Sequence, residues 1–486
     1  MSEEVRIIEE ILYRAASVPE LIGYPTVDAL LAELEALRER HPGQLTAQRI
    51  GTSRLGEPIH LYTLTPAGEG GAESGEERLS GLLAGGVHPN EPIGSWTIVH
   101  LVRELTEDPD LARRLGTVWH LVPCADPDAM RLNEGWFARP EDRETYFRNF
   151  YRPAGREQVE WTFPFSYKRA YFDAMMPETQ ALQRAIDLTR PDFYVPLHNA
   201  ESGGAYYYLS EPAPELYGIL HRLPEQLGIP LHRGEPEAGH FEELDAGIFA
   251  MGTLEAVYDW MEELGLDPVH PGAAGEASTG YARRYGSLSL IAEMPIWTHA
   301  QADDTAETQE SYSALLEQES TALQEAGEVL TGLLGKAEEH LSMETPFIRA
   351  GRSFLPTLVR AAEGHRARAA QPESRRPATV SEKHSLRGLL HMLRLRFGAI
   401  FLRAVQAEIA TGTAPAALRR VGEETEEVFS RWLTEADADE SGDFQPLPVK
   451  DVVGLQYGAV LALADHCLRR RARAGSSAAC RSQGPR

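Results

Sequence analysis

The stretch "LSGLLAGGVHPNEPIGSWTIVHLV", residues 79–102, joins two patterns that predict different secondary structures. Its first nine residues form a short apolar run, which is typical of a buried strand. Within "NEPIGSWTIVHLVRELTED", which begins at Asn90, the residue pattern predicts a helix that starts just after the strand. A strand followed at once by a helix is the building unit of α/β folds, so the stretch predicts this fold class.

The same alternation of helix and strand patterns continues on both sides of this stretch. "TVDALLAELEALRERHPG" at 26–43 has apolar residues at helical spacing and ends in a Pro-Gly stop. Strand patterns are found in "PIHLYTLTP" (58–66), "TVWHLVPCA" (117–125), "PDFYVPLHN" (191–199) and "SLSLIAEMPIW" (287–297). We therefore expect a mixed, mostly parallel sheet with helices on both faces.

The C-terminal part of the chain has helical patterns and no strand signal. Residues 304–341 predict one long helix that packs back on the sheet, and the basic, proline-containing segment 364–384 predicts a linker. Amphipathic helical patterns follow at 384–410, 414–436 and 449–470. We expect an α/β domain at 1–345, an all-α C-terminal region at 346–470, and a disordered tail at 471–486 with few apolar residues.

Composition and charge exclude several classes of protein. The 486 residues carry 47 basic and 73 acidic side chains and a formal net charge of -26, which argues against nucleic acid as a partner. Three distant cysteines, Cys124, Cys467 and Cys480, build neither a disulfide framework nor a cysteine metal cluster. The N-terminus has no secretory pattern, and no apolar run is long enough to span a membrane. We expect a cytoplasmic protein without a membrane partner; its oligomeric state is open.

Three of the predicted strands end on residues that can bind a metal or move a proton: His88, His198 and Glu293. The carboxyl ends of strands are where ligand sites collect in α/β folds. His88 and Glu91 could be polar residues of a turn, or two ligands of a metal whose third ligand is His198. A catalytic zinc site needs three protein ligands and one open position, and Glu293 could then act as the general base.

Two arginines lie between these residues in the sequence. Arg131 follows "CADPDAM" and Arg148 is part of "YFRNFYRP". A guanidinium can stabilise an oxyanion or bind a substrate carboxylate through two parallel hydrogen bonds. Spacing alone favours a surface salt bridge for each arginine over a role at the site.

Six segments together resemble zinc carboxypeptidases of the carboxypeptidase A type, in the order that this family has. They are "IGTSRLGEPIHLYTL" (50–64), "GGVHPNEPIGS" (85–95), "ADPDAMRLN" (125–133), "RNF" (148–150), "PLHN" (196–199) and "IAEMP" (291–295). The resemblance spans about residues 20–330 and identifies 1–345 as the catalytic domain. It implies one Zn²⁺ per chain on His88, Glu91 and His198, with Glu293 as the catalytic base.

The resemblance also implies that Arg131 polarises the scissile carbonyl and that Arg148 binds the terminal carboxylate of a peptide substrate. The sequence departs from the family pattern at Phe147, where the family has asparagine, and at Asp126 and Ala129 in the loop before Arg131. Two other functions are compatible with the motifs. One is an N-acyl amino acid deacylase of the aspartoacylase or succinylglutamate desuccinylase type, and the other is an inactive binding module on the same fold.

Overall fold

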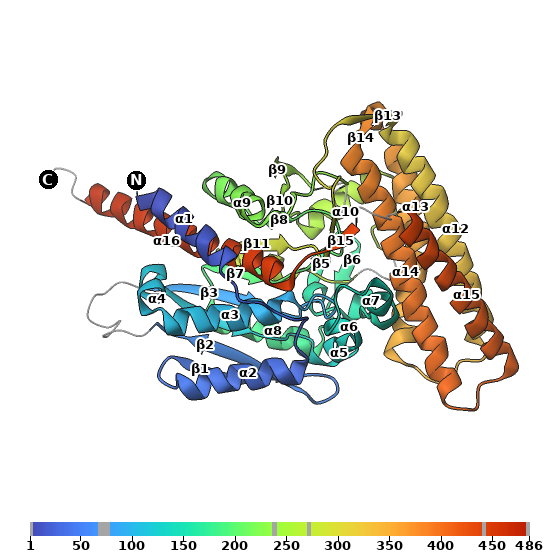
Figure 1. Cartoon of the computed structure of the whole chain (residues 1–486), viewed down its shortest axis with the longest axis horizontal. Coiled ribbons are helices and arrows are strands. Elements are labelled where there is room, and N and C mark those ends of the chain that lie inside the picture. Colours follow the sequence, from blue (N-terminus) through green and yellow to red (C-terminus); the bar gives the residue numbers. More distant parts are fainter. Residues whose placement is uncertain (1–2, 67–77, 236–240, 270–273, 440–443, 483–486) are drawn as a thin grey trace.

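A nine-stranded sheet forms the centre of the structure, a computed structural model that describes residues 3–66, 78–235, 241–269, 274–439 and 444–482 (Figure 1). The strand order is β1-β2-β4-β3-β7-β11-β8-β10-β9. The bounds are β1 (Leu45–Thr52), β2 (Pro58–Leu64), β3 (Leu79–Ala84), β4 (Thr117–Val122), β7 (Phe193–Pro196), β8 (Tyr206–Leu209), β9 (Glu243–Asp245), β10 (Ile248–Ala250) and β11 (Leu288–Glu293).

The sheet is mixed, as predicted. Its middle strands β4, β3, β7 and β11 pair in parallel, and so do β8 and β10. The antiparallel pairs are β1–β2, β2–β4, β11–β8 and β10–β9. Strand β3 is buried on both faces, which explains its continuous apolar run. Because successive side chains alternate across a strand, Leu82 and Leu83 belong to two different core clusters on opposite faces of the sheet.

Helices cover both faces of the sheet. Leu83 shares its cluster with residues of α1 (Glu3–Ala16), α3 (Ile93–Glu107), α9 (Pro214–Leu227) and α16 (Val449–Ser482), and Leu82 with residues of α8 (Pro177–Thr189). The remaining helices of this part are α2 (Val27–Arg40), α4 (Pro109–Leu115), α5 (Pro127–Arg131), α6 (Glu134–Phe137), α7 (Arg143–Asn149), α10 (Leu254–Glu263), α11 (Ser278–Ala282) and the 3-10 turns η1 (Gly155–Glu157), η2 (Val159–Trp161) and η3 (Arg283–Tyr285).

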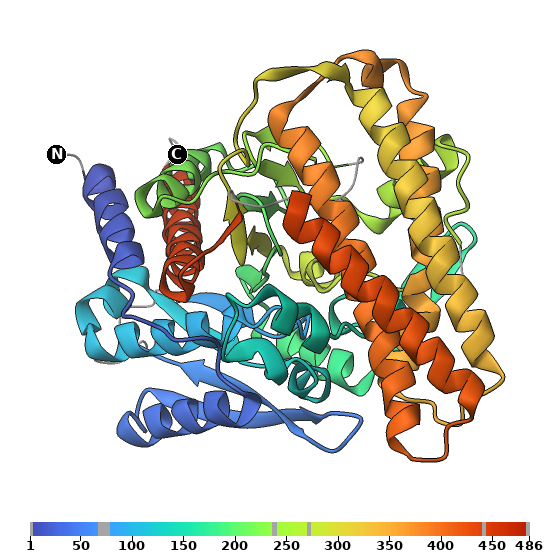
Figure 2. The ribbon, with the colours of Figure 1, turned by 45° about the vertical axis from the view of Figure 1, so that its right-hand side comes forward.

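Four long helices pack together beside the sheet and form what we call the helical region (Figure 2). They are α12 (Tyr312–Glu338), α13 (Pro346–Ala369), α14 (Val380–Ala410) and α15 (Ala416–Asp439). Short elements accompany them: η4 (Pro372–Arg375), β14 (Pro377–Thr379) paired with β13 (Glu307–Ser311), β15 (Phe444–Pro446) paired with β12 (Trp297–His299), and the hairpin β5 (Phe165–Tyr167) and β6 (Ala170–Phe172).

The structure differs from the sequence-based boundaries in three places. Helix α12 packs against α13 instead of the sheet, so the helical region begins before residue 345. The predicted linker 364–384 contains the end of α13 and the start of α14, where Thr379 and Glu382 form a capping box. Helix α16 returns to the sheet beside α1 and α9 and extends through the predicted tail to Ser482, while 483–486 lie outside the described residues (Figure 1).

Within the described ranges, no helix has the length and apolarity that crossing a membrane requires.

Asp126 is a buried carboxylic acid at the start of α5. Its Oδ1 accepts a hydrogen bond from the backbone N–H of Ala129 at 3.1 Å, and its Oδ2 is buried without a hydrogen-bond partner in the part of the chain that is described. Burial raises the pKa of Asp126 to about 7, although the nearby Arg54 guanidinium acts in the opposite direction. An asparagine here could keep the contact with Ala129, because its amide is neutral and its oxygen accepts hydrogen bonds.

Asp126→Asn is therefore expected to stabilise the protein at alkaline pH more than at acidic pH. The folded-state pKa of about 7 lies above the unfolded value near 3.9, so the folded state holds a proton that the unfolded state releases. The free energy of unfolding of the natural protein should consequently fall, relative to the variant, by about 2–3 kcal/mol between pH 5 and pH 8. Urea unfolding at both pH values measures this, and equal pH slopes in the two proteins would contradict it.

Candidate metal centre

Three neighbouring parallel strands bring His88, His198 and Glu293 to one edge of the sheet. Ala84 at the end of β3 pairs with Pro196 at the end of β7, and β7 pairs in parallel with β11. His198 follows β7 by two residues and forms an isolated parallel bridge with Glu293, the last residue of β11. The common carboxyl edge of the three strands is thus the place where these side chains meet.

The loop after β3 requires glycine at two positions. Asn199, which follows β7, binds the start of the helix at the end of this loop. A Cβ on Gly85 would lie 2.7 Å from the carbonyl oxygen of Pro123, and Gly86 has a φ of +61°. The first N–H of α3, at Ile93, donates to Asn199 Oδ1 at 3.0 Å, and Asn199 Nδ2 donates to the carbonyl of Met294 at 2.9 Å. Asn199 therefore joins the loops that follow β3, β7 and β11.

His88, Glu91 and His198 form a compact buried cluster. One ligand atom from each lies within 4.8 Å of the others. The Nδ1 of His88 is 3.2 Å from both carboxylate oxygens of Glu91, and the Nδ1 of His198 is 2.9 Å from Glu91 Oε2. All three residues are at most 5% exposed. The two imidazole rings meet edge to face, with centroids 4.7 Å apart.

The pKa values of the three residues indicate that the cluster favours a positive charge. Burial, with the nearby Arg152, lowers the pKa of His88 to about 3, so its imidazole is neutral. Burial would also lower the pKa of His198, but the carboxylates of Glu91 and Glu293 raise it to about 9. Burial favours the neutral acid of Glu91, yet the two histidines hold its pKa well below the usual value. The proton on His198 thus occupies a place that favours a cation.

The residues of the cluster fit a zinc ion. Two imidazoles and one carboxylate are a common donor set of catalytic zinc sites, which leave a further position open. Both Nδ1 atoms face the carboxylate, while the Nε2 atoms of His88 and His198 are buried without a hydrogen-bond partner among the described residues. The cluster therefore offers the two imidazoles and the carboxylate that a zinc ion would use as ligands.

Glu293 is next to the cluster and is 6% exposed. Its Oε1 lies 3.7 Å from His198 Nδ1. The strand ends below it are fixed by Gln456 of α16, whose Nε2 donates to the carbonyl of His198 at 3.0 Å. Gln456 Oε1 accepts from Thr97 Oγ1 at 2.8 Å, so the C-terminal helix supports the site from within the core.

The structure pairs Arg131 and Arg148, to which the resemblance gave roles at the substrate, with carboxylates outside the cluster. Arg131 pairs with Asp28 at 2.7 Å and with Glu57 at 3.2 Å. Arg148 pairs with Glu144 and Glu426, at 2.7 and 2.9 Å, and stacks on the ring of Phe429. Neighbouring carboxylates decide where these guanidinium groups lie, and Arg148 serves as a contact between α7 and α15.

Arg152 and Trp161 contact the cluster, and the sequence analysis did not identify them. Arg152 Nη1 donates to Glu91 Oε1 at 2.9 Å, its Nε donates to Gln158 Oε1 at 2.9 Å, and its guanidinium lies over the ring of Trp161 at 5.0 Å. The Trp161 ring meets His88 edge to face at 4.9 Å. Arg152 is only four residues after Arg148 in "YFRNFYRP", but spacing alone gives no reason to prefer it.

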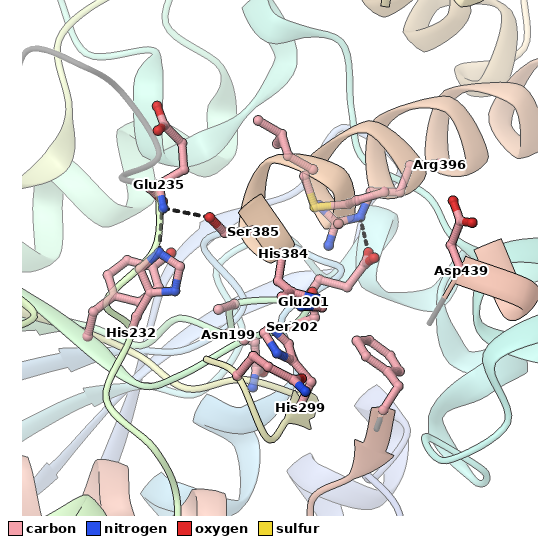
Figure 3. Close-up of a pocket in the computed structure, with 18 of the residues that line it drawn as sticks. Asn199, Glu201, Ser202, His232, Glu235, His299, His384, Ser385, Arg396 and Asp439 are labelled. Carbon is pink, nitrogen blue, oxygen red and sulfur yellow. Dashed lines mark hydrogen bonds and ion pairs between the residues drawn. The ribbon is translucent and has the colours of Figure 1, made fainter. Parts of the chain in front are cut away.

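A cavity of about 170 Å³ opens beside the cluster, between the sheet and helix α14 (Figure 3). Glu91 and Arg152 connect it to the cluster. Figure 3 shows Arg396 of α14 beside Glu201, and Ser385 of α14 beside Glu235. The helical region therefore forms one wall of the space next to the candidate metal centre.

Comparison with known proteins agrees with the motifs. The zinc carboxypeptidase family model matches residues 30–233. No curated protein matches the sequence. Among solved structures, carboxypeptidase A from Helicoverpa armigera is similar with 13% identity over 76% of this chain and 81% of its own, at a TM-score of 0.38. A metallo-carboxypeptidase from Burkholderia cenocepacia has 18% identity over 56% of this chain and 60% of its own, at a TM-score of 0.34. The α/β part of the chain is therefore similar to the zinc carboxypeptidase family over residues 30–233.

Proposed function

We propose that this protein is a zinc-dependent hydrolase that cleaves a C-terminal peptide bond. The observation that supports this most strongly is the meeting of His88, Glu91 and His198 after the adjacent strands β3 and β7. Glu293 and Arg152 contact the same cluster, so a basic carboxylate and an anion-binding group accompany the three ligands.

Each residue has a distinct role in this proposal. A zinc ion on His88, Glu91 and His198 would polarise the scissile carbonyl and increase the acidity of a water molecule. Glu293 would take the proton of the attacking water and deliver it to the leaving amine. Arg152 would bind the free carboxylate of the substrate, because a planar guanidinium matches a carboxylate with parallel hydrogen bonds. Its stacking on Trp161 and its bond to Gln158 hold it ready for this contact.

Substrate cleavage tests the proposal directly. We expect release of the terminal amino acid from peptides with a free C-terminus, little cleavage of the same peptides when amidated, and no cleavage after chelation of zinc. Arg152→Met should raise KM for the free peptides by about 10- to 100-fold, the loss of a charge-assisted hydrogen bond. It should leave the slow cleavage of amidated peptides almost unchanged.

Two outcomes would contradict the role of Arg152, and two others would favour the alternative functions. Equal cleavage of free and amidated peptides, or equal loss on both in Arg152→Met, would show that Arg152 does not bind the terminal carboxylate. Cleavage of N-acyl amino acids in place of peptides would favour the deacylase alternative, and zinc binding without any hydrolysis would favour the binding module.

A further inference from the structure

We propose that a second cavity, between α10 and α13, binds a medium-chain carboxylate, with the apolar chain inside the cavity and the carboxylate on Arg360. The cavity has a volume of about 500 Å³, within the roughly 300–1,000 Å³ of small-molecule sites. It is lined by neither the three candidate metal ligands nor Glu293, but Trp161 of its wall also contacts His88. The site is therefore a neighbour of the metal centre, and the inference goes beyond the proposed hydrolase function.

The segments that form the walls of this cavity are fixed to one another by polar contacts. The N–H of Gly275, in the loop before α11, donates to the carbonyl of Trp161 at 2.8 Å. The Oγ of Ser353, on α13, accepts a hydrogen bond from the first N–H of η1 at 3.1 Å. Lys168, in the turn of the β5–β6 hairpin, pairs with Asp259 of α10 at 2.7 Å. The cavity thus lies within a braced frame, and most of its lining follows the family match at 30–233.

The lining of the cavity is mainly apolar. The hairpin, α10 and α13 contribute Phe165, Ala170, Leu254, Val257, Met261 and Phe354. Trp161 completes this wall and remains 40% exposed. An apolar chain that covered these groups would remove their surface from water, which favours binding. We therefore expect each CH2 group added to a ligand to raise its affinity about fourfold until the cavity is full.

Arg360 of α13 gives this apolar cavity a positive charge. Its side chain is half-buried, and it forms no ion pair or hydrogen bond with the residues that the structure describes. Burial lowers the pKa of Arg360, while the nearby Glu363 acts in the opposite direction. A guanidinium that is partly removed from water without a paired carboxylate carries a desolvation cost. A bound carboxylate offsets this cost, because it accepts two parallel hydrogen bonds from the planar group.

Glu276 is also an ionisable residue of the described lining, and it favours one orientation of the ligand. Its Oε1 accepts a hydrogen bond from the N–H of Ala277 at 2.9 Å. Burial raises the pKa of Glu276, and the charges that act on it are those of Glu255 and Arg283. Glu276 therefore does not neutralise Arg360. A ligand carboxylate would be repelled by Glu276 and attracted by Arg360, so we expect its anionic end at α13.

Calorimetry of the full chain with decanoate, decan-1-ol and decylammonium tests the site. We expect saturable binding of decanoate, about 10- to 100-fold tighter than that of decan-1-ol, which is the contribution of a charge-assisted hydrogen bond. Decylammonium should bind more weakly than the alcohol. From hexanoate to decanoate the affinity should rise about fourfold per CH2 group. Zinc-loaded and chelator-treated protein should bind decanoate equally, because none of the candidate metal ligands lines the cavity.

Arg360→Met should remove the preference for decanoate over decan-1-ol and leave the affinity for the alcohol unchanged. The substitution deletes a half-buried charge without a paired carboxylate, so the fold should tolerate it. Arg366→Met, at an exposed position near the end of the same helix, is the matched control and should bind all three compounds as the natural chain does. Val257→Trp fills the cavity from α10 and should weaken the binding of decanoate and of decan-1-ol alike.

Equal affinities of the natural chain for decanoate and decan-1-ol, or a preference that survives in Arg360→Met, would overturn the proposal. Unchanged binding in Val257→Trp would do the same. Loss of decanoate binding on chelation, or in Arg152→Met but not in Arg360→Met, would place the carboxylate at the proposed substrate site and refute the second cavity. None of these results decides the hydrolase function, which the release of a terminal amino acid tests separately.

Discussion

Glu293→Gln is expected to lower kcat by about 1,000-fold while zinc remains bound. Glutamine has nearly the same shape as glutamate but cannot accept the proton of the attacking water, and positioned acid–base groups contribute about 100- to 10,000-fold to rates. Glu293 is the last residue of β11, is 6% exposed, and lies 3.7 Å from the imidazole of His198. It is not one of the three residues that form the ligand cluster, so the metal should stay.

Kinetics and metal analysis of the purified variant measure both effects. Glu160→Gln is the control for loss of a buried carboxyl near the site. Burial raises the pKa of Glu160 to about 7, and its Oε1 accepts a hydrogen bond from Ser278 at 2.6 Å, so a neutral amide can take its place. We expect less than a tenfold change in kcat for the control. A near-normal rate in Glu293→Gln would remove Glu293 from the role of general base.

Arg396→Met is expected to lower the free energy of unfolding by about 3–5 kcal/mol, because it leaves the buried carboxylate of Glu201 without its counter-charge. Arg396 Nε lies 2.6 Å from Glu201 Oε2, and its Nη2 donates to the hydroxyl of Tyr146 at 2.8 Å. The guanidinium also lies over the ring of Phe150 at 4.7 Å. This network joins α14 of the helical region to the α/β part of the chain.

Urea unfolding followed by circular dichroism measures the loss. The double variant Glu201→Gln with Arg396→Met removes the unpaired charge and should recover more than half of the stability, since the cost comes mainly from a buried charge without a partner. If Arg396→Met lowered the free energy of unfolding by less than about 1 kcal/mol, the pair of Arg396 and Glu201 would contribute no more than an exposed salt bridge. This result would contradict the expectation for a buried pair.

The meeting of the candidate ligands His88 and His198 with Glu293 at one edge of the sheet was predictable, because it depends on strand order. His88, His198 and Glu293 each follow an apolar run, and runs that become adjacent parallel strands place their ends together. Helix α13 was not predicted, because Gly351 and Pro356 interrupt its pattern and its basic end resembles a linker. The return of α16 to the sheet could not be predicted, because it depends on a contact between residues 258 positions apart. Gln456 of α16 donates a hydrogen bond to the carbonyl of His198.

The arginines show most clearly where sequence reasoning fails. Arg131, Arg148 and Arg152 are alike in residue type and close in sequence, so only their surroundings separate them. The path of the segment that carries Arg152 is set by Arg403 of α14, whose guanidinium donates to the carbonyls of Asn149 and Phe150 at 2.7 and 3.0 Å. A distant helix thus decides which arginine reaches Glu91.

Zinc content is the measurement that tests the central claim most directly. The purified natural chain and the His88→Ala, His198→Ala double variant should be analysed side by side after incubation with zinc and removal of the excess. The cluster predicts about one zinc ion per chain in the natural protein and none in the double variant, because two of the three ligands are lost. A natural protein that takes up no zinc, or a double variant that retains it, would contradict the metal centre described here.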